Sequence, residues 1–230
     1  MGNGLPPTFV INLDDRQGRL ETTRRRLTVL GSPIERIAAL SGPEAVAMGL
    51  RVANPRLSDG EIGCAASHLR AYELIVDRDL PCALIVEDDV LPVVRFRSRY
   101  RRVFALTPPD FLLLQVGHVD LAPLRHRSAR RLARVLGANV CPPFDLLRQT
   151  RFRYGTHAYV VSNQFARIAL EHCRPVFAAI DQMLSELTDE PTARRGCWVV
   201  DPSLALQDAT PSDVEPSRRE GFPAARRFLP

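Results

Sequence analysis

Several features are scarce or missing in this sequence. It contains no lysine, so all 31 Lys and Arg residues are arginines. It has no run of about 18 apolar residues, which excludes a membrane-spanning helix. Aromatic residues make up only 7% of the chain, and the arginine-rich segments 95–102 and 125–134 offer little aromatic surface for stacking bases. We therefore do not expect a nucleic-acid partner.

Cysteine usage argues against two further classes of protein. The five cysteines are an odd number and form no C-x-x-C pair, which argues against a disulfide framework or a cysteine-based zinc site. We expect most of them to be small buried hydrophobic residues. The N-terminus has neither a basic segment nor an apolar segment typical of a secretory signal, so we expect a cytoplasmic location.

The composition that is present suits one soluble α/β domain with a sizeable core. The chain has 230 residues, 45% of them hydrophobic and 25% charged. We expect the domain to cover residues 1–213 and the Pro/Arg-rich residues 214–230 to form a loosely attached tail. The basic segments have two interpretations. They are either solvated helix faces or surfaces for an anionic partner, including weak contact with the inner face of a membrane.

Apolar runs alternate with segments of helical periodicity along the chain. This order predicts an α/β fold with a mostly parallel central sheet flanked by helices. Residues 41–57 are expected to be a loop, with or without a short helix, and residues 117–150 have no clear pattern. The expected strands are 8–13, 34–40, 82–86, 110–116, 157–162 and 197–200. The expected helices are 58–78, 95–106, 163–172 and 177–187, together with one that the polar segment 14–19 leads into and that ends near residue 30.

The helix predicted from residue 58 has the strongest local signal. Ser58 followed by Glu61 is the pattern of a capping box, in which each side chain bonds a backbone N–H at the helix start. Gly63, Ala65 and Ala66 keep the first turns slim, so another backbone or a ligand can approach closely.

Three carboxylates follow a buried strand directly in the segment "ALIVEDDV" (83–90). We call Glu87, Asp88 and Asp89 the acid trio. Side chains alternate along a strand, so Glu87 and Asp89 are expected on one face and Asp88 on the other. Adjacent carboxylates repel, and a divalent cation relieves this conflict. Oxygen ligands suit Mg²⁺ or Mn²⁺, which in turn hold phosphate oxygens.

Two other interpretations of the acid trio stay open. The carboxylates could pair with arginines or cap the next element. Alternatively, one aspartate could be the nucleophile of a phosphatase-like site. The second is disfavoured because that chemistry usually places its aspartate after the first strand, where this chain has Asn12.

Four segments in order resemble glycosyltransferase family 25. They are "FVINLDDRQGR" (9–19), "LSDGEIGCAASH" (57–68), "LIVEDDV" (84–90), and "GTHAYVVSNQFARIAL" (155–170) followed by "AIDQML" (179–184). A weaker similarity is "PSLALQDATPSDV" (202–214). Asp15, Gly18 and Ala66 depart from the family's usual residues, and residues 117–150 match none of its motifs.

The resemblance implies a GT-A fold and an inverting transfer of a hexose, usually galactose, from a UDP-sugar. The acceptor stays open among a glycan, a lipid-linked molecule and a peptide. Two other functions also stay open: an arginine-rich module for anionic surfaces with a degenerate site, and another nucleotide-sugar or phosphoryl-transfer enzyme.

The resemblance also implies roles for individual residues. Asp89 and Glu87 are expected to bind Mn²⁺ or Mg²⁺, and Asp181 is the expected general base with His157 in reserve. Ser67 and His68 lie in the predicted helix that begins at residue 58 and carries the second of the four family segments. Ser212 is expected to close over the donor together with Gln207. The residues expected to bind the donor are Asn12, Asp14, Arg16, Arg19, Glu61, Gly63, His68, Glu87, Asp88 and Gln207.

Overall fold

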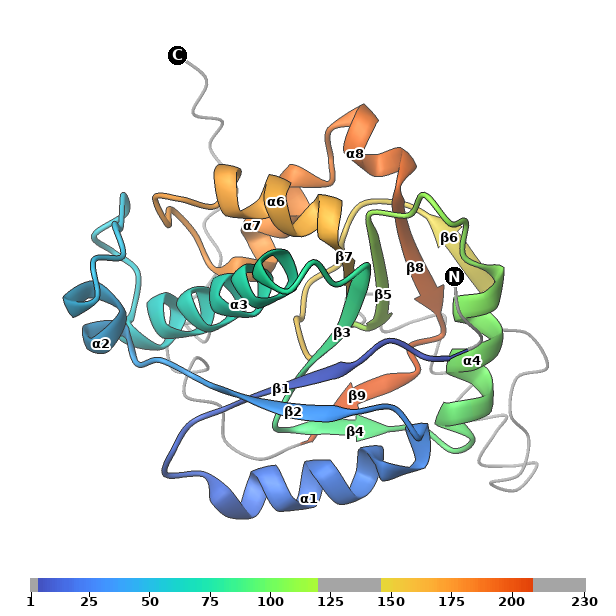
Figure 1. Ribbon diagram of the computed structural model, residues 1–230. Helices are drawn as coiled ribbons and strands as arrows, with labels where there is room; N and C mark the ends of the chain where they lie inside the picture. Colours follow the sequence, from blue (N-terminus) through green and yellow to red (C-terminus); the bar gives the residue numbers. More distant parts are fainter. Residues whose placement is uncertain (1–3, 120–145, 209–230) are drawn as a thin grey trace.

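Three parallel strands form one side of the central sheet in the computed structural model, which describes residues 4–119 and 146–208 (Figure 1). β1 (Thr8–Asn12) lies between β2 (Ile34–Ala38) and β3 (Cys82–Glu87). All five residues of β1 are buried, as expected for an apolar run that is covered on both faces. Ile11 pairs with Glu87, so the carboxyl ends of β1 and β3 meet at the same edge.

The remaining strands extend this sheet beyond β3. The order is β2-β1-β3-β7-β5-β8-β6, with β9 joined to β5 and β4 paired to β9. In the described ranges, six of the nine strands (β1, β2, β3, β5, β8 and β9) run in one direction, which confirms a mostly parallel sheet. The additional strands are β4 (Val90–Pro92), β5 (Leu113–Gly117), β6 (Leu146–Gln149), β7 (Ala158–Ser162), β8 (Cys197–Asp201) and β9 (Ala205–Gln207).

Helices cover both faces of the sheet, as predicted (Figure 1). Ile85 of β3 faces a core shared with α3 (Asp59–Asp77), α6 (Asn163–His172) and α7 (Ile180–Leu187). Its neighbour Leu84 faces the opposite core, which contains residues of α1 and α4. The other helices are α1 (Gln17–Leu27), η1 (Thr28–Leu30), α2 (Gly42–Ala47), α4 (Phe96–Leu106) and α8 (Pro191–Arg195).

The two predicted helix caps are confirmed, whereas the helix expected from residue 177 begins at Ile180. Ser58 and Glu61 form a reciprocal capping box at the start of α3, and the Ser162 hydroxyl accepts a 3.1 Å bond from the Phe165 N–H. The helix expected up to residue 30 ends at Leu27 and continues as a 3₁₀ turn. No helix in residues 4–119 or 146–208 is long and apolar enough to cross a membrane.

Short elements account for most of the differences from the prediction. β4 and β9 have three residues each and pair only with elements far away in the sequence, so neither produces a local periodic pattern. β6 and α8 were also not predicted. The expectations for residues 125–134, for Ser212 and for the tail 214–230 lie outside the described residues.

Gly63 is a point of close backbone approach. A β-carbon there would lie 2.4 Å from the Leu40 carbonyl oxygen and 3.0 Å from the Gly42 nitrogen. Ser67, one turn later, accepts a 2.9 Å bond from the Leu40 N–H and donates a 2.7 Å bond to the Gly63 carbonyl. The slim start of α3 therefore admits the chain's own loop between β2 and α2.

Candidate active site

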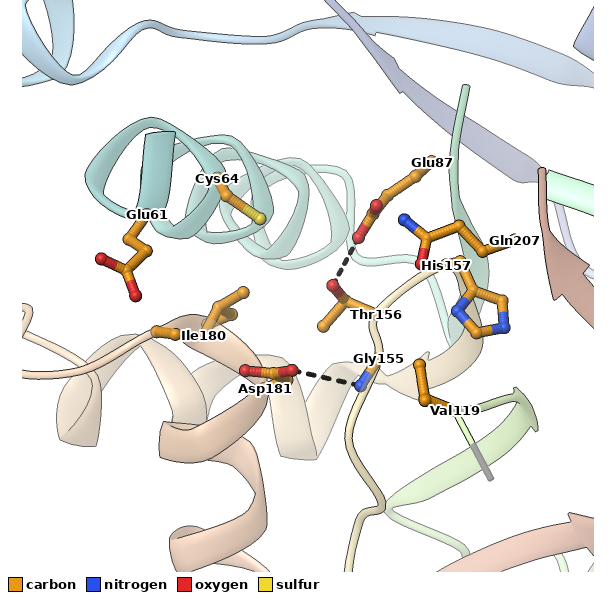
Figure 2. A pocket seen from close by; sticks show the side chains of 11 residues that line it. Glu61, Cys64, Glu87, Val119, Gly155, Thr156, His157, Ile180, Asp181 and Gln207 are labelled. Carbon is orange, nitrogen blue, oxygen red and sulfur yellow. Dashed lines mark hydrogen bonds between the residues drawn. The ribbon is translucent and has the colours of Figure 1, made fainter. Parts of the chain in front are cut away.

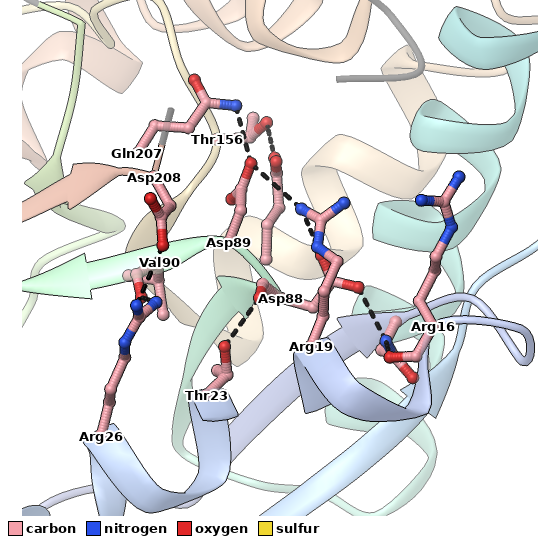
Figure 3. A network of polar contacts seen from close by, with 12 residues as sticks. Arg16, Arg19, Thr23, Arg26, Asp88, Asp89, Val90, Thr156, Gln207 and Asp208 are labelled. Atoms are coloured by element: carbon pink, nitrogen blue, oxygen red, sulfur yellow. Dashed lines mark hydrogen bonds and ion pairs between the residues drawn. The ribbon is translucent and has the colours of Figure 1, made fainter. Parts of the chain in front are cut away.

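The candidate site lies at the carboxyl edge where β1 and β3 end side by side (Figure 3). Asn12, the last residue of β1, donates a 2.7 Å bond from Nδ2 to Oδ2 of Asp88. Its Oδ1 accepts a 3.0 Å bond from Arg36 Nε. Because Asn12 is 1% exposed, these bonds hold the first aspartate of the turn in a defined position.

Arg19 of α1 contacts both aspartates of the acid trio (Figure 3). Its Nη2 lies 2.8 Å from Asp88 Oδ1 and 3.4 Å from Asp89 Oδ2. Gln207 at the end of β9 adds a 2.9 Å bond to the same Asp89 oxygen. Pairing with arginine, which the sequence left as an alternative, therefore occurs at Asp88 and Asp89.

Arg19 and Gln207 contact only one of the two carboxylate oxygens of Asp89 in the described part of the chain. The residue is 5% exposed, and its Oδ1 is buried without a hydrogen-bond partner in the described part of the chain. Burial, and then the nearby charge of Glu87, raise the pKa of Asp89 to about 7 despite Gln207 and Arg19. Burial likewise raises the pKa of Asp88. The site is therefore suited to accept a further cation.

Glu87 is held on the opposite side, toward α3. Its Oε1 accepts a short bond from the Thr156 hydroxyl and lies 3.5 Å from His68 Nε2. Burial by itself raises the pKa of Glu87, but its interactions with His68 and Thr156 outweigh burial and lower the pKa to about 2. Glu87 is therefore a carboxylate at neutral pH.

The expectation that Glu87 and Asp89 share one face while Asp88 takes the other was wrong in its premise. β3 ends at Glu87, and Asp88 and Asp89 lie in the turn that leads into β4. Strand alternation therefore does not apply to them. Asp88 and Asp89 share Arg19, whereas Glu87 contacts Thr156 and His68.

A cavity of about 370 Å³ opens beside the acid trio, between the ends of β1 and β3 and the start of α3. Its walls combine guanidinium groups with carboxylates, as expected for a site that holds an anionic ligand through a cation. The residues expected at the site that line this cavity are Asn12, Arg16, Arg19, Gly63, Ser67, His68, Glu87, Asp88 and Asp89.

A smaller cavity of about 60 Å³ adjoins the first one (Figure 2). Cys64 and Glu87 line both cavities and therefore mark their junction. The smaller cavity brings together the remaining expected residues from four separate segments: Glu61, His157, Asp181 and Gln207.

Asp181 and His157 are both buried in the smaller cavity. Asp181 lies in the first turn of α7, is 3% exposed, and accepts a 3.2 Å bond from the Gly155 N–H. His157 is 2% exposed and lies 3.0 Å from the Ala205 carbonyl through Nε2, whereas its Nδ1 has no hydrogen-bond partner in the described residues. Burial lowers the pKa of His157, which favours the neutral imidazole.

Asp14 is the expected site residue that lines neither cavity. Its side chain is 83% exposed and forms a short ion pair with Arg36. Arg36 also donates to both the side chain and the backbone carbonyl of Asn12. Asp14 is therefore connected to the site indirectly, through the contacts of Arg36 with Asn12.

Thr156, Cys64 and Arg36 contribute to the site but were not singled out in the sequence. Thr156 was adjacent to the expected His157, and Cys64 was inside the "GEIGCAASH" segment, four residues before His68. That spacing places Cys64 and His68 on one side of a helix, which is the signal that could have identified the cysteine. Arg36 carries no such local signal, because it comes from the middle of β2.

Comparison with known proteins identifies the family of this chain. The model of "Glycosyltransferase family 25 (LPS biosynthesis protein)" matches residues 5–184. Procollagen galactosyltransferase 1 of Danio rerio is 32% identical over 69% of this chain and 27% of its own length. A glycosyltransferase 25 family member of Drosophila pseudoobscura pseudoobscura is 32% identical over 79% of this chain and 30% of its own length. The chain thus spans less than a third of these relatives.

A solved glycosyltransferase involved in the glycosylation of the major capsid of PBCV-1 aligns over 94% of this chain and 98% of its own, with 12% identity and a TM-score of 0.49. The family model covers more than half of the chain and includes both the acid trio and the start of α7. This chain therefore belongs to glycosyltransferase family 25.

Proposed function

We propose that this chain transfers a hexose, with galactose as the expected sugar, from a UDP-sugar to a hydroxyl group of an acceptor. Family membership supports glycosyl transfer, and the galactosyltransferase relative supports the choice of sugar. The observation that carries the proposal is the buried carboxylate of Asp89, at the junction of β3, β1 and β9, whose Oδ1 has no hydrogen-bond partner in the described residues.

A divalent cation fits this position. Asp89 Oδ1 is a buried acceptor that no donor among the described residues reaches, and the raised pKa of Asp89 supports a need for positive charge beyond that of Arg19. Asp89 and Glu87 are the ligands we propose for Mn²⁺ or Mg²⁺. The cation, when bound, would neutralise negative charge on the departing diphosphate.

We place the UDP-sugar in the 370 Å³ cavity. Arg16 and Arg19 line this cavity and offer forked donors for the diphosphate oxygens. Asn12 orients Asp88, and Asp88 in turn holds Arg19 through the 2.8 Å ion pair. A diphosphate that draws Arg19 toward itself would leave Asp89 still more dependent on a cation.

We place the acceptor hydroxyl in the smaller cavity, beside Asp181. An inverting transfer requires a base on the acceptor side, opposite the leaving group. Asp181 is the proposed base because its carboxylate points into this cavity from the start of α7 (Figure 2). His157 is the reserve candidate, because burial favours its neutral form and its Nδ1 has no donor in the described residues.

Two classes of acceptor follow from the comparisons. The family description names lipopolysaccharide biosynthesis, which suggests a lipid-linked glycan. The galactosyltransferase relative is named for procollagen, which suggests a hydroxyl on a peptide. For a lipid-linked acceptor, the exposed arginines of α4, such as Arg97, Arg101 and Arg102, could provide weak contact with an anionic membrane.

The alternative with structural support is a site in which Arg19 permanently neutralises the trio and no cation binds. In that case the protein would be an anionic-surface binding module. Isothermal calorimetry with UDP-galactose, UDP-glucose, UDP and buffer, each with and without Mn²⁺, separates these functions. We expect cation-dependent binding of UDP compounds, and equal binding without Mn²⁺ would remove the cation from the mechanism.

Product analysis separates glycosyl transfer from other nucleotide-sugar or phosphoryl chemistry. With UDP-galactose and a panel of glycan, lipid-linked and peptide acceptors, we expect free UDP together with a galactosylated product. Release of UMP or inorganic phosphate instead would assign the site to phosphoryl transfer.

A further inference from the structure

Three potential metal ligands of different chemistry meet at the junction of the two cavities. Cys64 and His68 lie one turn apart on α3, and Glu87 ends β3. One ligand atom from each of the three residues lies within 4.8 Å of the other two. We call these three residues the mixed-donor cluster. Residues four positions apart on a helix share one side, so both side chains of α3 are presented to Glu87.

The orientation of His68 is set by a buried hydrogen-bond chain. The residue is 0% exposed, and its Nδ1 lies 2.6 Å from the Tyr159 hydroxyl, which lies 2.7 Å from the Tyr72 hydroxyl. This chain directs Nε2 toward Glu87, 3.5 Å away. Nε2 is buried, and among the described residues its polar contact is this one with the Glu87 carboxylate. A histidine held through one ring nitrogen while the other points at further ligands is the usual arrangement in metal sites.

Cys64 differs from the other cysteines that the structure describes. Burial raises the pKa of Cys82 to about 11 and the pKa values of Cys173 and Cys197 to about 12, so these remain thiols at neutral pH. Cys64 is only partly buried and lines both cavities. Its sulfur is therefore accessible to a cation that enters either cavity.

We propose that the mixed-donor cluster is a binding site for a thiophilic divalent cation such as Zn²⁺. The ligands would be Cys64 Sγ, His68 Nε2 and a carboxylate oxygen of Glu87, with the thiol proton released to solvent. Three protein ligands plus a position that faces a cavity is the pattern of zinc sites that keep one coordination place open. Small inward shifts of the three side chains would bring the donors to zinc-bond distances.

This site is chemically distinct from the oxygen site at Asp89. Thiolate and imidazole ligands select zinc or cobalt, whereas carboxylates with water select manganese or magnesium. Glu87 belongs to both sets, so a cation in the mixed-donor cluster would compete for one ligand of the proposed donor cation. Cation binding by the mixed-donor cluster is measured with no sugar nucleotide present, so its test does not depend on the proposed transfer reaction.

Cobalt titration of the full chain tests the proposal. Co²⁺ bound through a thiolate gives a sulfur-to-cobalt charge-transfer band together with visible bands of tetrahedral geometry. We expect these bands to saturate at one Co²⁺ per chain and to disappear when Zn²⁺ is added. Cys64→Ser should abolish the charge-transfer band, and His68→Gln should weaken cobalt affinity at least about tenfold.

Three matched variants complete the test. Tyr159→Phe removes the partner of His68 Nδ1 and should weaken cobalt affinity about 10–100-fold without removing a ligand. Cys82→Ala and the exposed His172→Gln should leave the bands unchanged. Equal charge-transfer bands in wild type and Cys64→Ser would mean adventitious thiol binding elsewhere and would overturn the proposal. Absence of any saturable band in the wild type would overturn it as well.

Asp89→Asn separates this proposal from the proposed function. The substitution should keep the cobalt bands and lose Mn²⁺-dependent UDP binding. If it instead removes the charge-transfer band, the mixed-donor cluster does not hold the metal as proposed. If the wild type shows the cobalt bands but does not bind UDP, the proposed transfer function is contradicted and the mixed-donor cluster is not.

Discussion

The side-chain amide of Asn12 donates a 2.7 Å hydrogen bond to the carboxylate of Asp88, which is 76 positions away in the sequence. The bond joins the ends of two adjacent parallel strands and places the first turn residue of the acid trio. Arg19 contacts the same carboxylate from the other side. One hydrogen-bonded unit thus links β1, α1 and the turn after β3, and each of these segments contributes to the proposed donor site.

Asn12→Asp should disrupt this unit with almost no change in side-chain volume. The variant loses the Nδ2 donor and places a carboxylate directly against Asp88, so we expect the affinity for UDP with Mn²⁺ to fall by about 1–3 kcal/mol. Calorimetry measures the change. Asp14→Asn is the matched control, because Asp14 is 83% exposed and lines neither cavity, and we expect its affinity to change less than about twofold. The reverse ranking would place Asp14, not Asn12, at the donor site.

Asp89→Asn should stabilise the metal-free protein at high pH. The pKa of Asp89 is about 7 in the folded protein and about 3.9 in an unfolded chain, so the folded state binds more protons between these values. Stability contributed by this group therefore falls as the pH rises from about 4 to about 7 and stays low above it. We expect Asp89→Asn to be more stable than wild type by about 1–3 kcal/mol near pH 8, with a smaller gap near pH 5.

Urea unfolding of both proteins at the two pH values measures this difference. Asp15→Asn is the control, because its side chain is 75% exposed and it should show no pH-dependent gap. Added Mn²⁺ and UDP should raise the stability of wild type but not that of Asp89→Asn. An Asp89→Asn protein that is less stable than wild type at high pH would show that Arg19 already neutralises this carboxylate.

Asp181→Asn should reduce turnover while leaving donor binding largely intact. Asparagine keeps an oxygen for the bond from the Gly155 N–H but cannot accept a proton from the acceptor. We expect the turnover number to fall about 10²–10⁴-fold, with donor affinity within about threefold of wild type. Asp189→Asn, at an exposed ion pair beyond the end of α7, is the control. Loss of donor affinity at unchanged turnover would remove Asp181 from the role of base.

Gly63→Val should impair folding itself, because a β-carbon would lie 2.4 Å from a backbone oxygen of residue 40, so the backbone would have to shift. We expect destabilisation of at least about 1–3 kcal/mol. Thermal unfolding measures it. Gly18→Ala is the matched control: no atom lies within 4 Å of its would-be β-carbon, and alanine favours the helix by about 0.5–1 kcal/mol. Equal melting temperatures for Gly63→Val and wild type would contradict the close approach.

Local sequence patterns were sufficient to predict the longer helices and strands. The capping box at Ser58 and Glu61 and the Ser162 cap depend on residues three positions apart, and both appear as predicted. The buried runs of β1, β3 and β7 were also visible, because consecutive apolar residues with β-branched side chains mark strands covered on both faces. β4 and β9 were not predicted because each has only three residues and forms by pairing with strands that are distant in the sequence.

The amino-acid sequence by itself determined the α/β class, the family and the presence of three carboxylates at the end of a buried strand, since each of these depends on residues that are neighbours in the chain. Only the tertiary structure decided how those carboxylates are used. It ended β3 at Glu87 and placed Arg19 against Asp88 and Asp89, and it brought His68 and Thr156 to Glu87. These contacts join distant segments, and the charges and burial that they impose on each carboxylate have no counterpart in any local pattern.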